Sequence, residues 1–276
     1  MSGALQWRPL APFGATIDLD LKGSVSGDQI DALRELFDRR HLLLFTGQSL
    51  SAADQRRVCG WFGPVEEDKP ASRFTTEPEM GALGAGELAF HSDMACTPAP
   101  LIGLSLLAIE VEERSSTTMF VDAMAAARDL PEILRRRIEG LHVMNLWPSE
   151  LAQRQRSHLA PAGWPGAAHP VLKPHPRTGE PILYLNANQS DRIVELEAAE
   201  SEDLIQALFQ RLYAPAHRYE HQWRNGDFIV WDNLALQHAR KPVPPGVVRT
   251  LQRVEIGACP WSDMAPEGLV AGYRQA

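Results

Sequence analysis

The sequence predicts one mainly β domain, residues 1–276, with flanking helices. Short strand-like segments with alternating or continuous apolar residues recur along the chain. Its 276 residues, of which 44% are hydrophobic, are enough for one substantial core. Residues with metal-binding chemistry stand at positions 91 and 238, and a chain that brings them together is more naturally one domain than two.

The N-terminal quarter predicts a strand, two helices and a buried strand. Ser26 and Asp28 precede a segment with apolar residues at helical spacing, and either of them suits the N-cap position. These elements are expected mainly to cover a sheet. In order, they are an edge strand within 7–25, which includes the alternating segment 15–19, a helix at 29–39, an apolar strand at 41–45 and a helix from 51 to about 62.

Residues 64–86 show little periodicity and are rich in Pro, Glu, Thr, Gly and Met. A long irregular segment inside a compact domain is usually functional or mobile. This segment leads directly into the candidate metal ligands, so it is interpreted as an active-site lid. For its middle part, a surface loop without function is the alternative.

The rest of the chain predicts a β-rich core with helices and a Pro-rich excursion. The excursion, residues 147–176, is expected to wrap the core without joining it. The other expected elements are strands at 101–112 and 117–121, a helix at 131–140, a strand at 182–186, a helix at 201–213 and strands at 226–233 and 247–256.

Composition excludes some classes of partner. A formal net charge of −8 gives no general attraction to nucleic acid or to an anionic membrane. The longest apolar run, about 101–109, is too short to cross a bilayer, and no signal peptide is evident. Cys59, Cys96 and Cys259 lack metal-ligand spacing, so reduced thiols in a cytoplasmic protein are expected.

The first chemical signal is His91-Ser92-Asp93. In an extended segment residues i and i+2 point to the same face, so the imidazole and the carboxylate can reach one ion while Ser92 faces away. A nitrogen and an oxygen together suit a borderline divalent metal. Alone the triplet is weak, because an ordinary hydrogen-bonded pair has the same sequence.

The second signal lies near the C-terminus. The strand at 226–233 leads to His238, and the strand at 247–256 places Arg249 and Arg253 on one face. Arginine binds carboxylates through a planar fork of donors. Two histidines and one carboxylate form the facial triad of non-haem iron(II) oxygenases, which leaves open positions on the metal.

With these residues in order, the chain resembles the taurine dioxygenase / 2,4-dichlorophenoxyacetate dioxygenase (TauD/TfdA-like) family of Fe(II)/2-oxoglutarate-dependent oxygenases. The resemblance implies a double-stranded β-helix (jelly-roll) core, Fe2+ bound by His91, Asp93 and His238, and 2-oxoglutarate and O2 as cosubstrates. The segments that carry it are 41–48, 61–64, 91–93, 116–120, 169–172, 231–233, His238 and the two arginines.

The resemblance also implies roles for four further residues. Arg249, eleven residues after His238, matches the arginine that binds the distal carboxylate of 2-oxoglutarate, and Thr118 matches the threonine beside it. Arg253 matches an arginine that binds the substrate sulfonate in the taurine enzyme. Asp68 stands where that enzyme carries a sulfonate-binding histidine, and this departure puts taurine in doubt because a carboxylate repels an anion. No catalytic residue is expected beyond the metal ligands.

The expected reaction is hydroxylation of a C–H bond of a small polar or aromatic acid or amino acid-like substrate, with succinate and CO2 as coproducts. Asp93 favours hydroxylation, because related halogenases carry Gly or Ala at this position. Desaturation, cyclisation and C–heteroatom cleavage on the same scaffold stay open. By analogy with the family, a homodimer or homotetramer is expected.

Two alternatives come from other classes. A non-catalytic, ligand-binding jelly roll has little reason to retain a complete triad together with Arg249. A zinc hydrolase would need a Glu base beside the histidines, and none is obvious. His217 and His221 have the i, i+4 spacing of a helical metal pair, but the alternation around them predicts a strand and a structural role.

Overall fold

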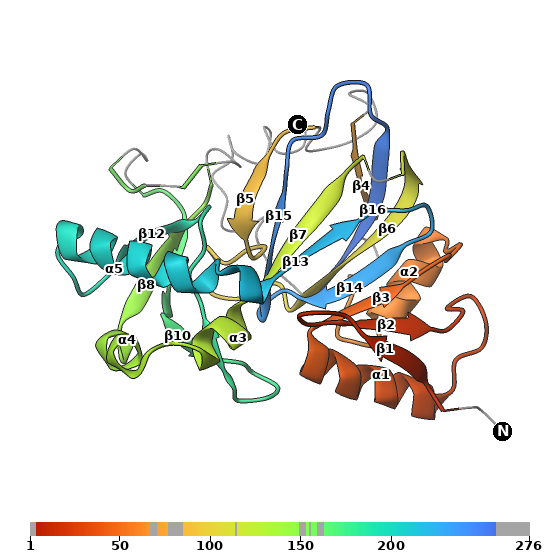
Figure 1. Ribbon diagram of the computed structural model, residues 1–276, viewed down its shortest axis with the longest axis horizontal. Helices are drawn as coiled ribbons and strands as arrows, with labels where there is room; N and C mark the ends of the chain where they lie inside the picture. Colours follow the sequence, from red (N-terminus) through yellow and green to blue (C-terminus); the bar gives the residue numbers. More distant parts are fainter. Residues whose placement is uncertain are drawn as a thin grey trace.

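The computed structural model describes residues 4–66, 71–76, 85–113, 115–148, 153–154, 156–158 and 163–257, and it is mainly β with few helices. A seven-stranded sheet crosses the molecule (Figure 1). Its strands are antiparallel except for β2 and β3, which run parallel. In spatial order they are β1 (Gln6–Pro9), β2 (Ala15–Asp18), β3 (Leu42–Phe45), β14 (Phe228–Asp232), β6 (Gly103–Val111), β16 (Arg249–Ile256) and β4 (Ser72–Thr75).

A second, four-stranded antiparallel sheet carries both candidate metal-binding histidines and Thr118. Both sheets line one cavity. The larger sheet contributes Trp231 of β14 to its wall, and the smaller sheet contributes His238. The cavity therefore lies where the inner faces of the sheets meet. The strands of the smaller sheet are, in order, β13 (Arg218–Gln222), β7 (Thr117–Asp122), β15 (Leu236–Arg240) and β5 (Leu88–His91).

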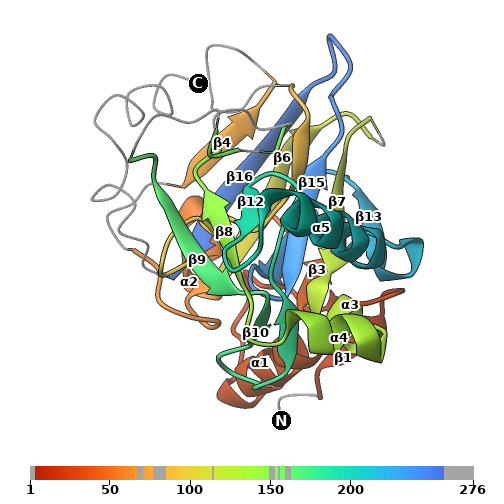
Figure 2. The same ribbon diagram turned by 90° about the vertical axis from the view of Figure 1, so that its left-hand side faces the viewer.

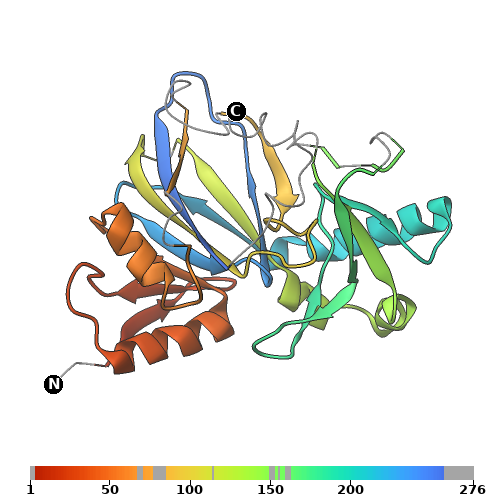
Figure 3. The ribbon, with the colours of Figure 1, turned by 180° about the vertical axis from the view of Figure 1, so that it is seen from behind.

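Two helices cover the other face of the seven-stranded sheet, as Figure 3 shows from behind. Helix α1 (Gly27–Arg40) begins at Ser26, whose side chain accepts from the backbone N–H of Gln29, so one of the two candidate caps is confirmed. Helix α2 (Ala52–Cys59) also begins with a serine cap. Helix α1 packs apolar residues against β3 and β14, and helix α2 packs against β6 and β16.

The segment between β7 and β13 forms a lobe beside the sheets (Figure 2). It contains a three-stranded sheet of order β12-β8-β9 and a hairpin of β10 and β11, and α5 packs against its strands. Its elements are α3 (Ala123–Arg128), α4 (Glu132–Ile138), β8 (His142–Leu146), β9 (Gly166–Pro170), β10 (Leu172–Pro174), β11 (Pro181–Leu183), β12 (Ser190–Ile193), α5 (Ala198–Leu212) and the 3-10 turn η1 (Pro215–His217).

Buried charges attach this lobe to the rest of the domain. His175 Nε2 lies 2.9 Å from Asp232 Oδ2, and both side chains are fully buried. Arg177 donates to the same Asp232 carboxylate and, through Nε, to Asp38 of α1 at 2.6 Å. One carboxylate at the end of β14 is thus shared by an imidazole and a guanidinium, which lowers the pKa of Asp232 to about 2 despite the opposing effect of burial.

Three sequence expectations need correction. The single edge strand expected within 7–25 corresponds to two strands, since β1 lies at the edge of the sheet while β2 pairs with both β1 and β3. The segment 64–86 is not wholly irregular, since its residues Ser72–Thr75 form β4 against β16. Helix α3 was not predicted, because six Ala-rich residues carry too short a pattern to show helical periodicity.

Two of the three cysteines lie in the described part of the chain. Cys59 and Cys96 are buried and are not joined in a disulfide, while Cys259 lies outside the described residues. In the part of the chain that the structure describes, no helix combines the length and the apolar character that crossing a bilayer requires.

We predict that Gly226→Ala destabilises the fold strongly. Gly226 has φ +80° in the turn before β14, and an added Cβ would lie 2.8 Å from the backbone O of Gln48. The left-handed backbone costs about 1–2 kcal/mol and overpacking about 1–3 kcal/mol more. Gly246→Ala is the matched control, because Gly246 also has φ +80° but has nothing within 4 Å of an added Cβ. Urea unfolding should show the larger loss at Gly226, and equal losses would contradict this account.

Candidate metal centre

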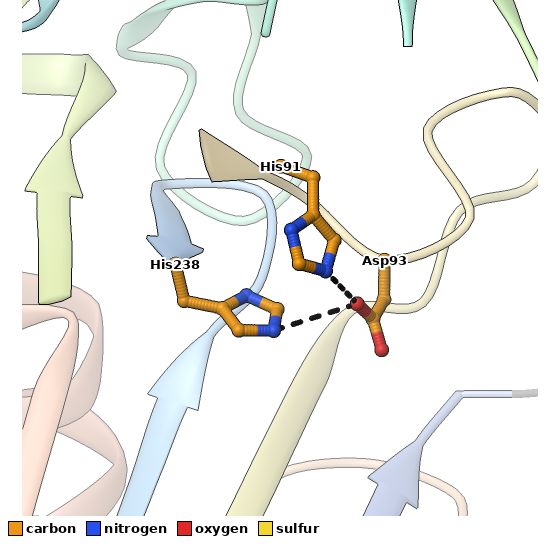
Figure 4. A group of neighbouring side chains, drawn as sticks. All are labelled: His91, Asp93 and His238. Atoms are coloured by element: carbon orange, nitrogen blue, oxygen red, sulfur yellow. Dashed lines mark ion pairs between the residues drawn. The ribbon is translucent and has the colours of Figure 1, made fainter. Parts of the chain in front are cut away.

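Strand pairing brings the two candidate histidines together. In the four-stranded sheet His91, the last residue of β5, pairs directly with His238 on β15. The imidazole rings lie side by side, with centroids 4.3 Å apart. Asp93 follows two residues later in a turn, and Figure 4 shows its carboxylate directed towards both rings.

The ligand atoms converge on one point. Asp93 Oδ1 lies 3.1 Å from His91 Nε2 and 3.5 Å from His238 Nε2. All three candidate ligand atoms lie within 4.8 Å of one another, and no other group of three or more His, Cys, Asp or Glu within the described ranges has this geometry. Each of these side chains is only 12–14% exposed.

The hydrogen bond made by His91 leaves its Nε2 ready to act as a ligand. His91 Nδ1 lies 2.8 Å from the backbone carbonyl of Ala89, so in the neutral ring Nδ1 carries the hydrogen and Nε2 has a free lone pair. That lone pair faces Asp93 Oδ1. Two acceptors at this distance repel each other unless a cation or proton lies between them. The donor set of two imidazoles and one carboxylate therefore fits a divalent metal such as iron(II).

The surroundings shift the pKa values of two candidate ligands, His238 and Asp93. Burial, with the charge of His91 acting in the same direction, lowers the pKa of His238 to about 3, so its imidazole is neutral at neutral pH. Burial alone would raise the pKa of Asp93. The guanidinium of Arg253, which donates to Asp93 Oδ2, together with both imidazoles, more than offsets burial and lowers it well below the usual range.

The candidate ligands line a cavity between the sheets that is open to solvent, with about 500 Å3 of space including its mouth. Its walls combine three arginines with several apolar side chains. The lining residues are Phe74, Leu88, His91, Asp93, Leu106, Thr118, Trp231, His238, Ala239, Arg240, Arg249 and Arg253.

Arg249 lines the cavity, although the residue is buried from bulk solvent. Its residue is only 3% exposed, and no described residue accepts a hydrogen bond from its guanidinium. Burial, assisted by the nearby charge of Arg240, lowers its pKa to about 9, so it stays protonated at neutral pH. A buried cation without a carboxylate partner is costly, and an anionic ligand would remove that cost.

Thr118 lines the same cavity, on β7. Its Oγ1 accepts a hydrogen bond of 2.9 Å from the indole Nε1 of the fully buried Trp223. The threonine hydroxyl therefore keeps its own hydrogen available for another acceptor. No role was predicted for Trp223, because only the fold brings it next to Thr118.

Of the two candidate substrate-binding residues, Arg253 and Asp68, the structure describes only Arg253. Arg253 does line the cavity, and it is engaged by two carboxylates, those of Asp93 and of Glu255, whose Oε1 lies 2.7 Å away. Asp68 lies outside the described residues.

The rival histidine pair is not a metal site. His221 lies on a strand, as expected, and its Nε2 is 3.0 Å from Asp227. His217 instead contacts Asp129, at 2.9 Å. Each imidazole therefore has its own carboxylate partner, and neither faces the cavity.

The sequence matches one family model over residues 6–254, the taurine catabolism dioxygenase TauD, TfdA family. An alpha-ketoglutarate-dependent 2,4-dichlorophenoxyacetate dioxygenase of Cupriavidus pinatubonensis is 26% identical, over 89% of this chain and 95% of the relative. A (S)-phenoxypropionate/alpha-ketoglutarate-dioxygenase of Sphingobium herbicidovorans is 28% identical, over 93% of this chain and 97% of the relative.

A solved structure shows the same fold. The chain superimposes on AAD-2, solved in complex with Mn(II) and N-oxalylglycine, with a TM-score of 0.79 at 20% identity. The superposition covers 93% of this chain and 98% of that one.

We predict that the three converging residues bind a divalent metal. His91→Ala and His238→Ala should each weaken Mn(II) binding at least about a hundredfold, since losing a ligand should cost at least as much as losing a residue that only hydrogen-bonds to a ligand. His142→Ala is the control, because His142 bonds Glu195 in the lobe and does not line the cavity. Calorimetric titration of the metal-free proteins measures the affinities. Unchanged affinity in both ligand variants would contradict the assignment.

Proposed function

Since this chain belongs to the taurine catabolism dioxygenase TauD, TfdA family, we propose that it hydroxylates a C–H bond of a small polar or aromatic acid or amino acid-like substrate. The chain is an oxidoreductase, an Fe(II)- and 2-oxoglutarate-dependent dioxygenase. It uses Fe(II), 2-oxoglutarate and O2, and its substrate is a small molecule.

The reaction consumes one O2 and one 2-oxoglutarate for each substrate. One oxygen atom enters succinate as CO2 is lost, and the other enters the product as a hydroxyl group. When bound, the iron supplies the activation of O2 that couples this decarboxylation to C–H cleavage. The protein holds the reactants in place and keeps bulk water from the buried site.

We assign the metal to His91, Asp93 and His238, and the distal carboxylate of 2-oxoglutarate to Arg249 and Thr118. One observation carries this assignment: an uncompensated, buried Arg249 guanidinium lines the same cavity as three converging metal-ligand atoms. A carboxylate at Arg249 would receive charge-assisted hydrogen bonds. The Thr118 hydroxyl, oriented by Trp223, could donate to the same group.

The proposed substrate class follows from the cavity walls. Phe74, Leu88 and Leu106 offer an apolar surface beside the candidate metal ligands, and Arg253 adds a cation that is partly neutralised by Asp93 and Glu255. Such a site suits a small molecule with an apolar or aromatic body and one polar end. The two relatives are named for aryloxyalkanoate substrates, which have this form. Asp68 is proposed as a second substrate contact from the sequence alone.

Other features of the proposal concern the whole chain. We propose a double-stranded β-helix core, and the two facing sheets around the cavity support it. The chain would form one domain, 1–276, with residues 64–86 as a lid, and would act in the cytoplasm as a dimer or tetramer. The family resemblance supports the oligomer by analogy.

We predict that Arg249→Met raises the KM for 2-oxoglutarate roughly 10- to 150-fold, because a hydrogen bond to a charged group contributes about 1.5–3 kcal/mol. Mn(II) affinity should change little. Arg136→Met serves as the control, since Arg136 is exposed on α4 and pairs only with Glu132. Initial rates of succinate formation give the KM. A KM that stays within twofold of the wild-type value would exclude Arg249 from the 2-oxoglutarate site.

The function itself is tested by a substrate screen. Succinate release with Fe(II), 2-oxoglutarate and O2 should rise at least tenfold with one or more aryloxyalkanoates, aromatic acids or amino acids, and mass spectrometry should show the product gaining one oxygen atom. His91→Ala should abolish the stimulation. Full succinate formation by His91→Ala would contradict the proposed chemistry, while a product that has lost two hydrogens would show desaturation instead of hydroxylation.

A further inference from the structure

Asn233 is a fully buried residue whose side chain bonds to the backbone of a candidate metal ligand. Its Oδ1 accepts from the backbone N–H of Asp93 at 2.8 Å, and its Nδ2 donates to the backbone carbonyl of the same residue at 2.9 Å. Nδ2 also donates to the carbonyl of Leu101 at 2.8 Å. One amide thus makes three hydrogen bonds with backbone that lies more than 130 residues earlier in the sequence.

Asp93 needs such support because it is not held by a strand. Strand β5 ends at His91, and Asp93 lies in the following turn. In that turn Met94 has φ 61°, a left-handed conformation that is unusual for a residue with a side chain. The turn makes short-range hydrogen bonds of its own, such as Thr97 N–H to Met94 O at 3.0 Å. These bonds shape the turn but do not fix its position relative to His238.

Asn233 fixes the position of the Asp93 turn from the other side of the site. It directly follows β14 and belongs to the turn that leads into β15, which carries His238. The same turn is held by Asp232, whose Oδ1 accepts from the backbone N–H groups of Leu234 and Ala235. The Asn233 amide therefore joins the segment that carries Asp93 to the segment that leads to His238.

We propose that Asn233 is a positioning residue of the metal centre. It touches none of the three ligand atoms. Instead, its amide fixes the backbone of Asp93, and through it the placement of Asp93 Oδ1 relative to the Nε2 atoms of His91 and His238. Substituting residues that hydrogen-bond to a metal ligand without touching the ion commonly changes metal affinity by about 10- to 100-fold. The inference rests on the proposed assignment of the metal to these three residues.

The test compares metal affinity in two proteins that each lose one buried asparagine. Asn233→Ala removes all three hydrogen bonds and should weaken Mn(II) binding at least about tenfold. Asn145→Ala is the matched control. Asn145 is equally buried, on β8 of the lobe, where its Oδ1 accepts from the hydroxyl of Ser190 at 2.7 Å, and it does not line the cavity. The Mn(II) affinity of Asn145→Ala should stay within twofold of the wild-type value.

A second readout separates positioning from general destabilisation. In the metal-free proteins, hydrogen exchange of the segment 92–101 should be faster in Asn233→Ala than in Asn145→Ala, with both compared at the same interval below their own Tm. Asn233→Asp keeps the acceptor for the Asp93 N–H but loses both donated bonds, and it should also weaken Mn(II) binding and speed this exchange.

Each outcome decides the proposal. A folded Asn233→Ala protein with wild-type Mn(II) affinity and wild-type exchange would overturn it. If neither Ala nor Asp at position 233 gives a folded protein, the amide serves the fold as a whole and the proposal also fails. If wild-type protein binds no Mn(II), or His91→Ala binds it equally well, the metal centre itself is wrong, which is a distinct result.

Discussion

The pairing of β5 with β15 is the constraint on which the site depends. It sets His91 opposite His238, although the two residues are separated by more than half of the chain. Antiparallel neighbours in a sheet lie about 5 Å apart, and their side chains share a face. Two imidazoles in this position can bind one ion without any further folding step. Asp93, two residues beyond the end of β5, completes the group from the adjoining turn.

The buried charged groups in and near the site differ in whether the protein gives them a partner. Asp93 is balanced by Arg253, and Asp232 by His175 and Arg177, so these carboxylates are paired inside the protein. Arg249 is different, because no described residue accepts a hydrogen bond from its guanidinium. Among the described residues, these two carboxylates thus have partners inside the protein, whereas the Arg249 guanidinium has no protein acceptor. This division is typical of a binding site, since a stable fold would otherwise neutralise such a group.

The tripeptide Trp231-Asp232-Asn233 shows how one short segment serves both fold and site. The ring of Trp231 packs edge-on to His238, with centroids 5.0 Å apart, and lines the cavity. Asp232 faces the other way and binds the lobe through His175 and Arg177. Asn233 bonds to the turn that carries Asp93. Successive side chains thereby connect the candidate metal ligands to the lobe and to each other.

The sequence by itself determined the elements with strong local signals and the residues with distinctive chemistry. The helix after Ser26, the apolar strand before Phe45 and the strand character around His221 follow from periodicity and capping, which are local properties. His91, Asp93 and His238 could be selected because their residue types and order match a known metal-binding pattern. That pattern says nothing of distance, however, and the convergence of the three was a prediction until the sheet was known.

Only the tertiary structure decided the contacts made across the sheets. Strand β4 lies in a segment without periodicity and is stabilised by pairing with β16, while the short strand β8 pairs with β9 and β12, so local sequence could not reveal either. The same holds for the indole of Trp223 on Thr118 and the amide of Asn233 on Asp93, whose partners are more than 100 residues away. Hydrogen bonds between residues so far apart in the sequence depend on topology, and topology is a property of the whole chain.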